Sequence, residues 1–508
     1  MKILGINPKD YYTGWPVQSD FGRELYRTPA LTFPVLKQLI PERHEVRFLE
    51  GFFDPVPMRE YNALLEWPEV VGMNIASSYG SINYAILLGQ IRRKNPDAFV
   101  MAGGHHANMY PERWLDMGVD LIVKGEAELT FAGIVEEIEG GRKFDNVPGV
   151  IFKRDGEYVE TESPPQIETL DESPIPDYDL INFGIYPALV KDGGGYVGSL
   201  ETSRGCMFRC RFCAVPPYWQ GTQRYKSPGR AVKEVELLKE RNVRQINIVD
   251  DGFGNDEARL HELLEAFIAV PDMPAWTSFL RVDTLLHDPG IVEKLARAGM
   301  KATLLGYESL DEEVLRKTMG KGMRGRPVLP RLQEIYREFR KHGIMVIGVF
   351  ISGHPDIPSE KDTKYMTARK VCDDPRMADY MPFPRSIGWD ELCERFDIKD
   401  MFFHDAKLQV FPEVNLNAIV FNMMNILDLP RTIRMLTGGP QYRKYLTHSH
   451  RMLWSKLFRL DRRKLRDFML LRRKNMTSDE KQKKLFEWYV EDPEYQRWLD
   501  QLEDKVWF

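Results

Sequence analysis

Three closely spaced cysteines constrain this chain more than any other feature of its sequence. Cys206, Cys210 and Cys213 lie in the stretch 201–213, which reads ETSRGCMFRCRFC, and are spaced Cys-x3-Cys-x2-Cys. Thiolates hold iron–sulfur clusters, and the usual electron-transfer cluster takes four of them. Three thiolates can hold three irons of a four-iron cluster and leave the fourth iron open. The spacing therefore predicts a 4Fe–4S centre that takes part in chemistry.

A zinc site is the main alternative for these cysteines. Zinc is usually held by four Cys or His ligands in paired groups. The remaining cysteines, Cys372 and Cys393, lie far apart in the sequence and form no second pair. They are expected to be ordinary buried thiols. We therefore favour the iron–sulfur interpretation over a zinc knuckle or three unrelated thiols.

The cysteine stretch resembles the signature of the radical S-adenosylmethionine (SAM) superfamily. The resemblance implies that the amino and carboxylate groups of SAM chelate the open iron. It further implies that SAM is cleaved reductively to a 5'-deoxyadenosyl radical, which abstracts hydrogen from an unactivated carbon. An electron donor such as flavodoxin or ferredoxin is the partner that such an enzyme needs.

The composition is consistent with an enzyme of this kind. The chain has 508 residues, of which 43% are hydrophobic and 29% charged, as in soluble globular proteins of two or three domains. No apolar run is long enough to span a bilayer, and the first residues lead into a strand pattern rather than a signal peptide. Five cysteines argue against a disulfide scaffold. We expect a cytoplasmic protein under anaerobic conditions, and the net charge of −5 gives no reason to expect a nucleic-acid partner.

The first 165 or so residues alternate between apolar segments of strand length and helix-sized segments. The predicted strands are 2–6, 44–49, 70–75, 99–102 and 121–124, and the clearest helices are 30–39 and 81–94. This order predicts a parallel, doubly wound, Rossmann-like sheet. Ligands of such sheets bind beyond the carboxyl ends of the strands.

Short segments that contain serine or glycine follow three of these strands. They are Ser77 and Ser78, then Gly103, Gly104 and His105, then Gly125 and Glu126. Glycine lets a backbone approach a bulky ligand, although a single Gly-Gly pair is more often just a tight turn. Together the loops resemble the cobalamin-binding domain that precedes the radical SAM domain in one large branch of the superfamily. The resemblance implies that these residues contact cobalamin.

One expected motif is absent from this region. Cobalamin proteins that replace the lower cobalt ligand with histidine carry Asp-x-His-x-x-Gly, and no such string occurs in the first 165 residues. We therefore interpret His105 as a loop former or a phosphate-side contact rather than a cobalt ligand. Cobalt without a histidine ligand suits methyl transfer.

A Pro-rich connector, SPIPDYDL at 173–180, separates this region from a second series of strands and helices. Clustered prolines cannot continue a helix or a central strand, so they predict a domain boundary. From about residue 195 the alternation predicts a partial or full barrel, and the resemblance implies six strand–helix units. The predicted domains are a cobalamin-binding domain at 1–165, a linker at 166–190, a partial (β/α)6 radical SAM barrel at 191–410 and a helical domain at 411–508.

Polar or glycine residues follow the predicted barrel strands. They are Asp250 and Asp251, Arg281, Glu308 and Ser309, and Gly348. The resemblance implies that they bind SAM: the acid pair or a nearby carbonyl its amino group, Arg281 its carboxylate. Glu308 and Ser309 correspond to contacts with the ribose and the carboxylate, and the strand at Gly348 to the one against which adenine stacks. The alternative for the acid pair is a helix cap. No catalytic residue is assigned.

The C-terminal region is basic and aromatic. Residues 443–474 contain twelve Lys or Arg and two Asp. A helical cap with a solvated basic face is the favoured interpretation, because charge runs usually face solvent. The alternative is contact with an acidic lipid surface or an anionic substrate.

The predicted function is methylation of an unactivated carbon of a small-molecule or lipid-like substrate, with a 4Fe–4S cluster, SAM and cobalamin as cofactors. One alternative keeps the cofactors and replaces methyl transfer by oxidative ring closure or rearrangement. An alternative of another class is a non-catalytic sensor of cobalamin or of the cluster.

Overall fold

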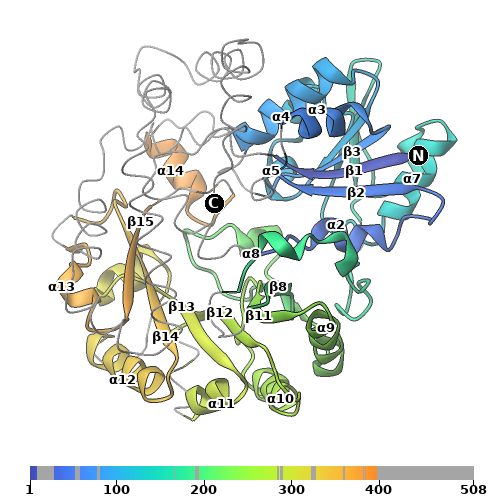
Figure 1. Cartoon of the computed structure of the whole chain (residues 1–508). Helices are drawn as coiled ribbons and strands as arrows, with labels where there is room; N and C mark the ends of the chain where they lie inside the picture. The colour runs from blue at the N-terminus through green and yellow to red at the C-terminus, as the bar shows by residue number, and fades with distance from the viewer. Residues whose placement is uncertain are drawn as a thin grey trace.

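The computed structural model describes most of the first 396 residues. The described residues are 1–8, 28–51, 56, 58–76, 81–164, 166–188, 194–282, 285, 290–321, 328–358, 361–380, 383 and 385–396. Ser77 and Ser78, the predicted helical domain and its basic stretch all lie outside them. Two α/β units, each built around one sheet, make up the described part (Figure 1). None of the helices described is long and apolar enough to span a bilayer.

The first unit is built on a seven-stranded sheet within the described residues, in the order β2-β1-β3-β4-β5-β6-β7. The strands are β1 (Lys2–Asn7), β2 (Glu45–Glu50), β3 (Val70–Asn74), β4 (Phe99–Gly103), β5 (Leu121–Val123), β6 (Val150–Arg154) and β7 (Glu157–Glu160). Neighbours from β2 to β5 pair in parallel, which confirms the predicted sheet. The order 2-1-3-4-5 is that of flavodoxin-like folds.

Helices cover both faces of this sheet, so it is doubly wound. They are α2 (Thr32–Lys37), α3 (Met58–Glu66), α4 (Ser81–Lys94), α5 (His105–Met109), α6 (Pro111–Asp116) and α7 (Phe131–Gly140). One apolar core holds buried Tyr61 of α3 and Trp114 of α6. A second core, on the other face, holds Leu36 of α2 and Ile134 of α7. Figure 1 shows α3 and α4 on one side of the strands and α2 on the other.

The antiparallel hairpin β6–β7 corrects the sequence prediction, which treated the chain after residue 128 as a helix running into a connector. β6 pairs antiparallel with both β5 and β7, and extends the first sheet. Asp155 and Gly156 form the two-residue turn with φ of 51° and 87°. An Asp-Gly pair between apolar strands is a strong hairpin signal, because both turn residues need positive φ.

The second unit is a barrel-like sheet of six parallel strands among the described residues, paired in chain order. The strands are β8 (Tyr196–Leu200), β11 (Val243–Ile248), β12 (Ala275–Arg281), β13 (Met300–Glu308), β14 (Met345–Ser352) and β15 (Asp374–Asp379). The helices that follow in the chain are α9 (Pro228–Glu240), α10 (Glu257–Ile268), α11 (Ile291–Arg297), α12 (Val328–Lys341) and α13 (Tyr365–Ala368). This arrangement confirms the partial (β/α)6 barrel.

Smaller elements shape the mouth of the barrel. They are β9 (Ser203–Gly205) and β10 (Gln223–Tyr225), which pair antiparallel, α8 (Val215–Tyr218), a π-helical turn (Val314–Thr318) and α14 (Trp389–Phe396). Short 3₁₀ segments are Phe144–Asn146, Tyr178–Leu180 and Phe183–Ile185. Ser227 caps α9 by accepting a hydrogen bond from the amide of Arg230, and Pro228 occupies the first turn, as helix starts favour.

Candidate functional site

The cysteine loop follows the carboxyl end of β8, and Asp250 holds its first residues. The Asp250 carboxylate accepts hydrogen bonds from the Thr202 amide (2.6 Å), the Thr202 hydroxyl (2.6 Å) and the Ser203 hydroxyl (2.7 Å). Burial raises the pKa of Asp250 to about 6 against the effect of these bonds. The side chain predicted to face SAM therefore anchors the strand that leads to the cysteines.

Asp251 anchors the next step of the same loop. Its Oδ2 accepts from the Gly205 amide (3.0 Å) and from the Trp219 indole N–H (2.9 Å). Gly205 has a φ of 88°, and a Cβ placed there would lie 2.2 Å from the carbonyl oxygen of Thr222. The turn into Cys206 thus requires glycine both for its backbone angle and for space.

The three predicted cluster ligands lie in this loop as free thiols. Cys206 and Cys210 are buried, and Cys213 is partly exposed. Burial raises the pKa of Cys213 to about 12 and raises that of Cys206 as well. A metal that binds to Cys206 and Cys213 would therefore have to displace their protons.

Two side chains donate hydrogen bonds to these sulfurs. Asn255 Nδ2 donates to Cys206 Sγ (3.4 Å), and Arg281 Nη1 donates to Cys210 Sγ (3.0 Å). The Arg281 guanidinium also stacks on the Phe208 ring, 3.6 Å from its centroid. Hydrogen bonds and positive charge at the sulfurs tune iron–sulfur clusters. Arg281, predicted to meet SAM, therefore also faces a cluster ligand.

The donor atoms of the cysteine loop have the chemistry of cluster ligands. In the part of the chain that the structure describes, no three His, Cys, Asp or Glu side chains converge closely enough to hold one metal ion. Three thiolates that each bind a different iron do not need to share one ion. The three sulfurs and the N–H donors beside them thus fit a 4Fe–4S cluster.

The ends of β13 and β14 hold the other predicted SAM contacts. Glu308 is buried with a φ of 61°, and its Oε1 accepts from Lys321 Nζ at 3.2 Å. Lys321 also donates to the Gly306 carbonyl oxygen. The Ser309 hydroxyl accepts from the Asp311 amide at 3.1 Å. A non-glycine residue at positive φ is a form of backbone strain that collects at functional sites.

Gly348 lies on the outer side of β14. A Cβ placed there would lie 2.7 Å from Cys372 Sγ and 2.9 Å from the Tyr307 ring. Both neighbours belong to the core between sheet and helices. The missing side chain of Gly348 therefore makes room for core packing, and only the backbone is left for a contact with adenine.

Lys321 and Asn255 were missed by sequence reasoning. Neither residue lies in a motif. Each side chain extends from a loop and contacts residues that are distant in the sequence. The only available signal was their position shortly after a barrel strand.

A helix from beyond the barrel closes over the cysteine loop. The Gly388 amide donates to the Arg211 carbonyl oxygen (3.0 Å), and the Arg211 guanidinium pairs with Glu391 of α14 (2.5 Å). Leu392 of α14 is buried in a small core that Phe212 contacts. Arg211 and Phe212 stand between the second and third cysteines, so α14 covers the middle of the loop.

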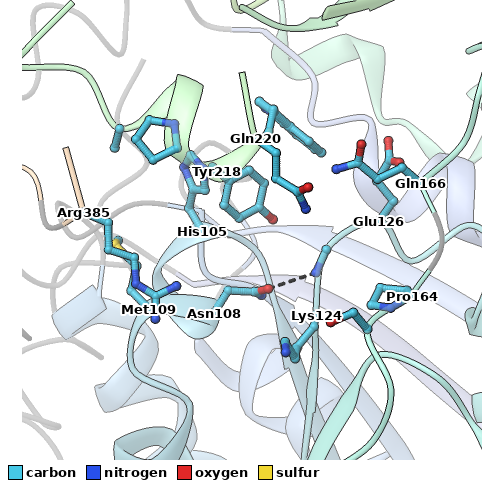
Figure 2. Close-up of a pocket in the computed structure, with 15 residues that line it drawn as sticks. His105, Asn108, Met109, Lys124, Glu126, Pro164, Gln166, Tyr218, Gln220 and Arg385 are labelled. Carbon is cyan, nitrogen blue, oxygen red and sulfur yellow. Dashed lines mark hydrogen bonds between the residues drawn. The ribbon is translucent and has the colours of Figure 1, made fainter. Parts of the chain in front are cut away.

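A cavity of about 270 Å³ lies between the two units (Figure 2). It is lined by His105, Asn108, Met109, Lys124, Gly125, Glu126, Ser163, Pro164, Gln166, Ala214, Pro217, Tyr218, Trp219, Gln220 and Arg385. The first unit contributes α5 and the loop after β5, and the second contributes α8, directly after the last cysteine. The structure thus places predicted His105, Gly125 and Glu126 around one space.

His105 has an unpartnered nitrogen at this cavity. Its buried Nε2 has no hydrogen-bond partner among the described residues. The imidazole meets the Tyr218 ring edge-on, with 3.6 Å between centroids. Burial lowers the pKa of His105 to about 4, so the ring is neutral at neutral pH.

The two glycines before His105 differ in what they do. Gly104 has a φ of 91°, and a Cβ there would lie 2.4 Å from Asn74 Oδ1 and 2.9 Å from the backbone of Ile75. A Cβ at Gly103 would meet no atom closer than 3.5 Å. Asn108 Oδ1 accepts from the Gly125 amide at 2.9 Å (Figure 2). Gly104 is thus fixed by packing onto β3, and Asn108 joins the two predicted cobalamin loops.

Comparison with known proteins identifies both units. A model of the B12 binding domain matches residues 25–135, and a model of the radical SAM superfamily matches residues 200–364. The chain therefore belongs to the radical SAM superfamily, in the branch that carries a B12-binding domain ahead of the radical SAM domain. It is an enzyme whose cofactors are a 4Fe–4S cluster, SAM and cobalamin.

Two curated proteins are similar along most of their length. An uncharacterised methyltransferase of Pyrococcus horikoshii is 28% identical over 401 residues, which cover 77% of this chain and 83% of the relative. The anaerobic magnesium-protoporphyrin IX monomethyl ester cyclase of Synechocystis is 25% identical over 377 residues, covering 73% of this chain and 72% of the relative.

Solved structures share the fold. The radical SAM methyltransferase TsrM from Kitasatospora setae, with cobalamin and a 4Fe–4S cluster bound, superposes with a TM-score of 0.58 at 18% identity and covers 78% of each chain. The cobalamin-dependent radical enzyme OxsB, with aqua-cobalamin and SAM bound, gives a TM-score of 0.60 at 14% identity, over 97% of this chain and 84% of OxsB.

The cavity fits the polar edge of a cobalamin. Asn108, Gln166 and Gln220 supply amide groups, and Lys124 and Arg385 supply cations. Such groups suit a ligand that carries amides and a phosphate. The rest of so large a molecule has to lie beyond this space.

Proposed function

We propose that this enzyme methylates an unactivated carbon of its substrate. When bound, the cluster with SAM would supply a 5'-deoxyadenosyl radical that removes hydrogen, and cobalamin would supply the methyl group. The observation that carries the proposal is the contact between Tyr218 and His105. Because α8 begins two residues after Cys213, this contact puts the cluster loop next to the predicted cobalamin loop, with one short helix between them.

The residues of the chain have distinct roles in this proposal. Cys206, Cys210 and Cys213 hold three irons and leave one for SAM. Asp250 and Asp251 keep the loop in place, so the backbone carbonyls after β11 are left for the SAM amino group. We assign the SAM carboxylate and ribose to the region of Arg281, Glu308 and Ser309 at the neighbouring strand ends. Gly103, Gly104, His105, Gly125 and Glu126 shape the cobalamin side, together with Ser77 and Ser78.

We further propose a small-molecule or lipid-like substrate and an electron donor such as flavodoxin or ferredoxin. A cytoplasmic, anaerobic setting follows from the oxygen sensitivity of a cluster with one open iron. Peripheral membrane contact through residues 443–474 stays a hypothesis that depends on their composition alone.

Ring closure is the second candidate reaction. It rests on one observation, the similarity to the Synechocystis protein named as a cyclase. Both reactions use the same cofactors, so only the product separates them.

The decisive experiment uses the reconstituted full chain with SAM, cobalamin and a reductant. We expect 5'-deoxyadenosine from the wild type and none from Cys206→Ala, because the variant cannot hold the cluster. Cys372→Ala is the matched control, since Cys372 is also buried but lies in the barrel core. SAM with a deuterated methyl group then tests the outcome on candidate substrates.

A product that carries the labelled methyl in place of one hydrogen supports methylation. A product that has lost hydrogen without gaining the label supports ring closure instead. If a chain with a full iron complement forms no 5'-deoxyadenosine, methylation and ring closure are both contradicted and a sensor is favoured.

A further inference from the structure

Glu126 connects the cavity to the cysteine loop. Its side chain is 2% exposed, and its two oxygens pair with two arginines of the second unit. Oε1 accepts from Arg204 Nη1 at 2.5 Å, and Oε2 accepts from Arg224 Nη1 at 2.6 Å. Oε2 also accepts from the Ile167 amide at 3.0 Å. The carboxylate is thus shared between the loop after β5, the connector and the barrel unit.

Arg204 and Arg224 face each other across the β9–β10 pair. Arg204 stands two residues before Cys206 and also pairs with Glu128 and Glu201, at 2.9 Å each. Burial raises the pKa of Glu201, but the charge and hydrogen bond of Arg204 outweigh it, and the pKa lies below its usual value. The strand that enters the cluster loop is therefore held by carboxylates from both units.

Burial makes this contact depend strongly on geometry. The Arg204 and Arg224 side chains are 11% and 10% exposed. Buried charges cost free energy unless they are paired and hydrogen-bonded, and removal of one partner leaves the other uncompensated. Glu126 is the acid that both arginines share. A displacement of the loop after β5 would therefore also disturb the ion pair of Arg204 in β9.

Aromatic side chains also link the cavity to the two arginines. The Trp219 ring lies 5.8 Å from the Arg204 guanidinium and 5.5 Å from that of Arg224. Tyr218 packs edge-on against Trp219 at 4.6 Å, and against His105 at 3.6 Å. Glu126 and Trp219 thus line the cavity and also contact the side chains that hold the cysteine loop.

From this geometry we infer that Glu126 is a positioning residue that couples the two cofactor sites. A cobalamin that orders the cavity holds the loop after β5, and through Glu126 and Arg204 it stabilises the entry to the cysteine loop. Because binding linkage is reciprocal, cluster assembly raises the affinity for cobalamin by the same factor. The inference rests on the two cofactors of the proposed function but not on the reaction that they carry out. A failure of the methyl-transfer proposal would therefore leave it unchanged.

The test measures cobalamin affinity with and without the cluster. Hydroxocobalamin is titrated into the full-length chain before and after cluster reconstitution, with the cluster verified by its iron content and absorbance. We expect the cluster to tighten binding by at least about fivefold in the wild type, the lower end of typical coupling. In Glu126→Gln the ratio of the two dissociation constants falls close to one.

Glu234→Gln is the matched control. Glu234 is fully buried and pairs with Lys226 at 2.9 Å and Arg230 at 2.8 Å. It also accepts from the Tyr178 hydroxyl at 3.2 Å, and none of these three partners lines the cavity. We expect a comparable loss of stability and an unchanged ratio. If Glu126→Gln does not fold, Glu128→Gln probes the same arginine, since Glu128 pairs with Arg204 without lining the cavity. It should lower the ratio in part.

Three results would overturn the inference. The first is a wild-type ratio of one. The second is a Glu126→Gln variant that weakens cobalamin equally with and without the cluster, which identifies Glu126 as a direct cobalamin contact. The third is an equal drop of the ratio in Glu126→Gln and Glu234→Gln, which reduces the ion pairs to general stabilisation.

Discussion

Asp250 is a buried carboxyl group whose role at the site is to hold other residues. It is 5% exposed and bonded to Thr202 and Ser203, and Arg259 also donates to the carbonyl oxygen of Thr202. Burial disfavours the charged form and raises the pKa of Asp250 to about 6, from an ordinary value of 3.8. The base of the cysteine loop therefore carries a titration that an exposed carboxylate would not show.

This titration predicts a pH dependence of stability. A folded-state pKa above the unfolded one contributes stability below pH 3.8, and that stability is lost as the pH rises through about 6. The two values correspond to roughly 3 kcal/mol. In Asp250→Asn this loss disappears, so the variant should gain on the wild type between these pH values. Denaturant unfolding of both chains over that range measures the difference, and parallel curves would contradict the assignment.

Single residues differ in how far their roles follow from the sequence. The assignment of the three cysteines to a cluster depends on their spacing alone and stays a prediction. The sequence singled out the acid pair but not the direction in which its side chains point. Asp250 points toward Thr202, which lies 48 positions earlier in the sequence. Lys321 and Asn255 reach their partners through folded loops, and no local pattern announces such contacts.

The loop after β4 shows how one glycine of a pair carries the constraint. Gly104 adopts a left-handed φ against Asn74 and Ile75, whereas Gly103 has ordinary space around its Cβ position. The backbone of Ile75 cannot yield as a flexible side chain would. The close approach of this loop to β3 thus depends on Gly104.

We therefore expect Gly104→Ala to weaken cobalamin binding and to lower the free energy of unfolding by about 1–3 kcal/mol through backbone strain, with the clash added. Gly103→Ala, one residue earlier, should leave the free energy of unfolding unchanged, because the nearest atom to its Cβ position lies 3.5 Å away. Hydroxocobalamin titration and thermal unfolding of the two variants provide the measurement. Equal behaviour of the two would show that the loop relaxes.

Among the elements, those with strong apolar periodicity were predictable, and α4 was predicted with the limits 81–94 that the structure has. β15 was missed because its sequence, DPRMAD, is charged and lacks the apolar run of a buried strand. Its place in the sheet comes from pairing with β14. The hairpin β6–β7 was missed although its Asp-Gly turn was visible.

At the scale of the whole molecule, two units that match different family models contact each other at one junction. The cavity, the Glu126 ion pairs and the His105–Tyr218 contact all lie between them. Sequence reasoning predicted both sheets, because each depends on local alternation. It did not predict the junction, because Arg204 and Glu126 are 78 positions apart and neither belongs to a shared pattern.

The junction predicts that cobalamin stabilises both units. A ligand that binds only the folded state adds roughly 2.7 kcal/mol at a hundredfold excess over its dissociation constant. We expect hydroxocobalamin to slow amide hydrogen exchange in α5 and also in β9 and β10, across the junction. Protection confined to the first unit would contradict a transmission of stability across the junction.

The helix that closes over the cysteines also dictates an order of events in the cell. Glu391 lies 180 positions after its partner Arg211. A ribosome has therefore released all three thiols long before α14 exists to cover them. Until residues 389–396 have been made, the cysteine loop therefore lacks its contacts with α14.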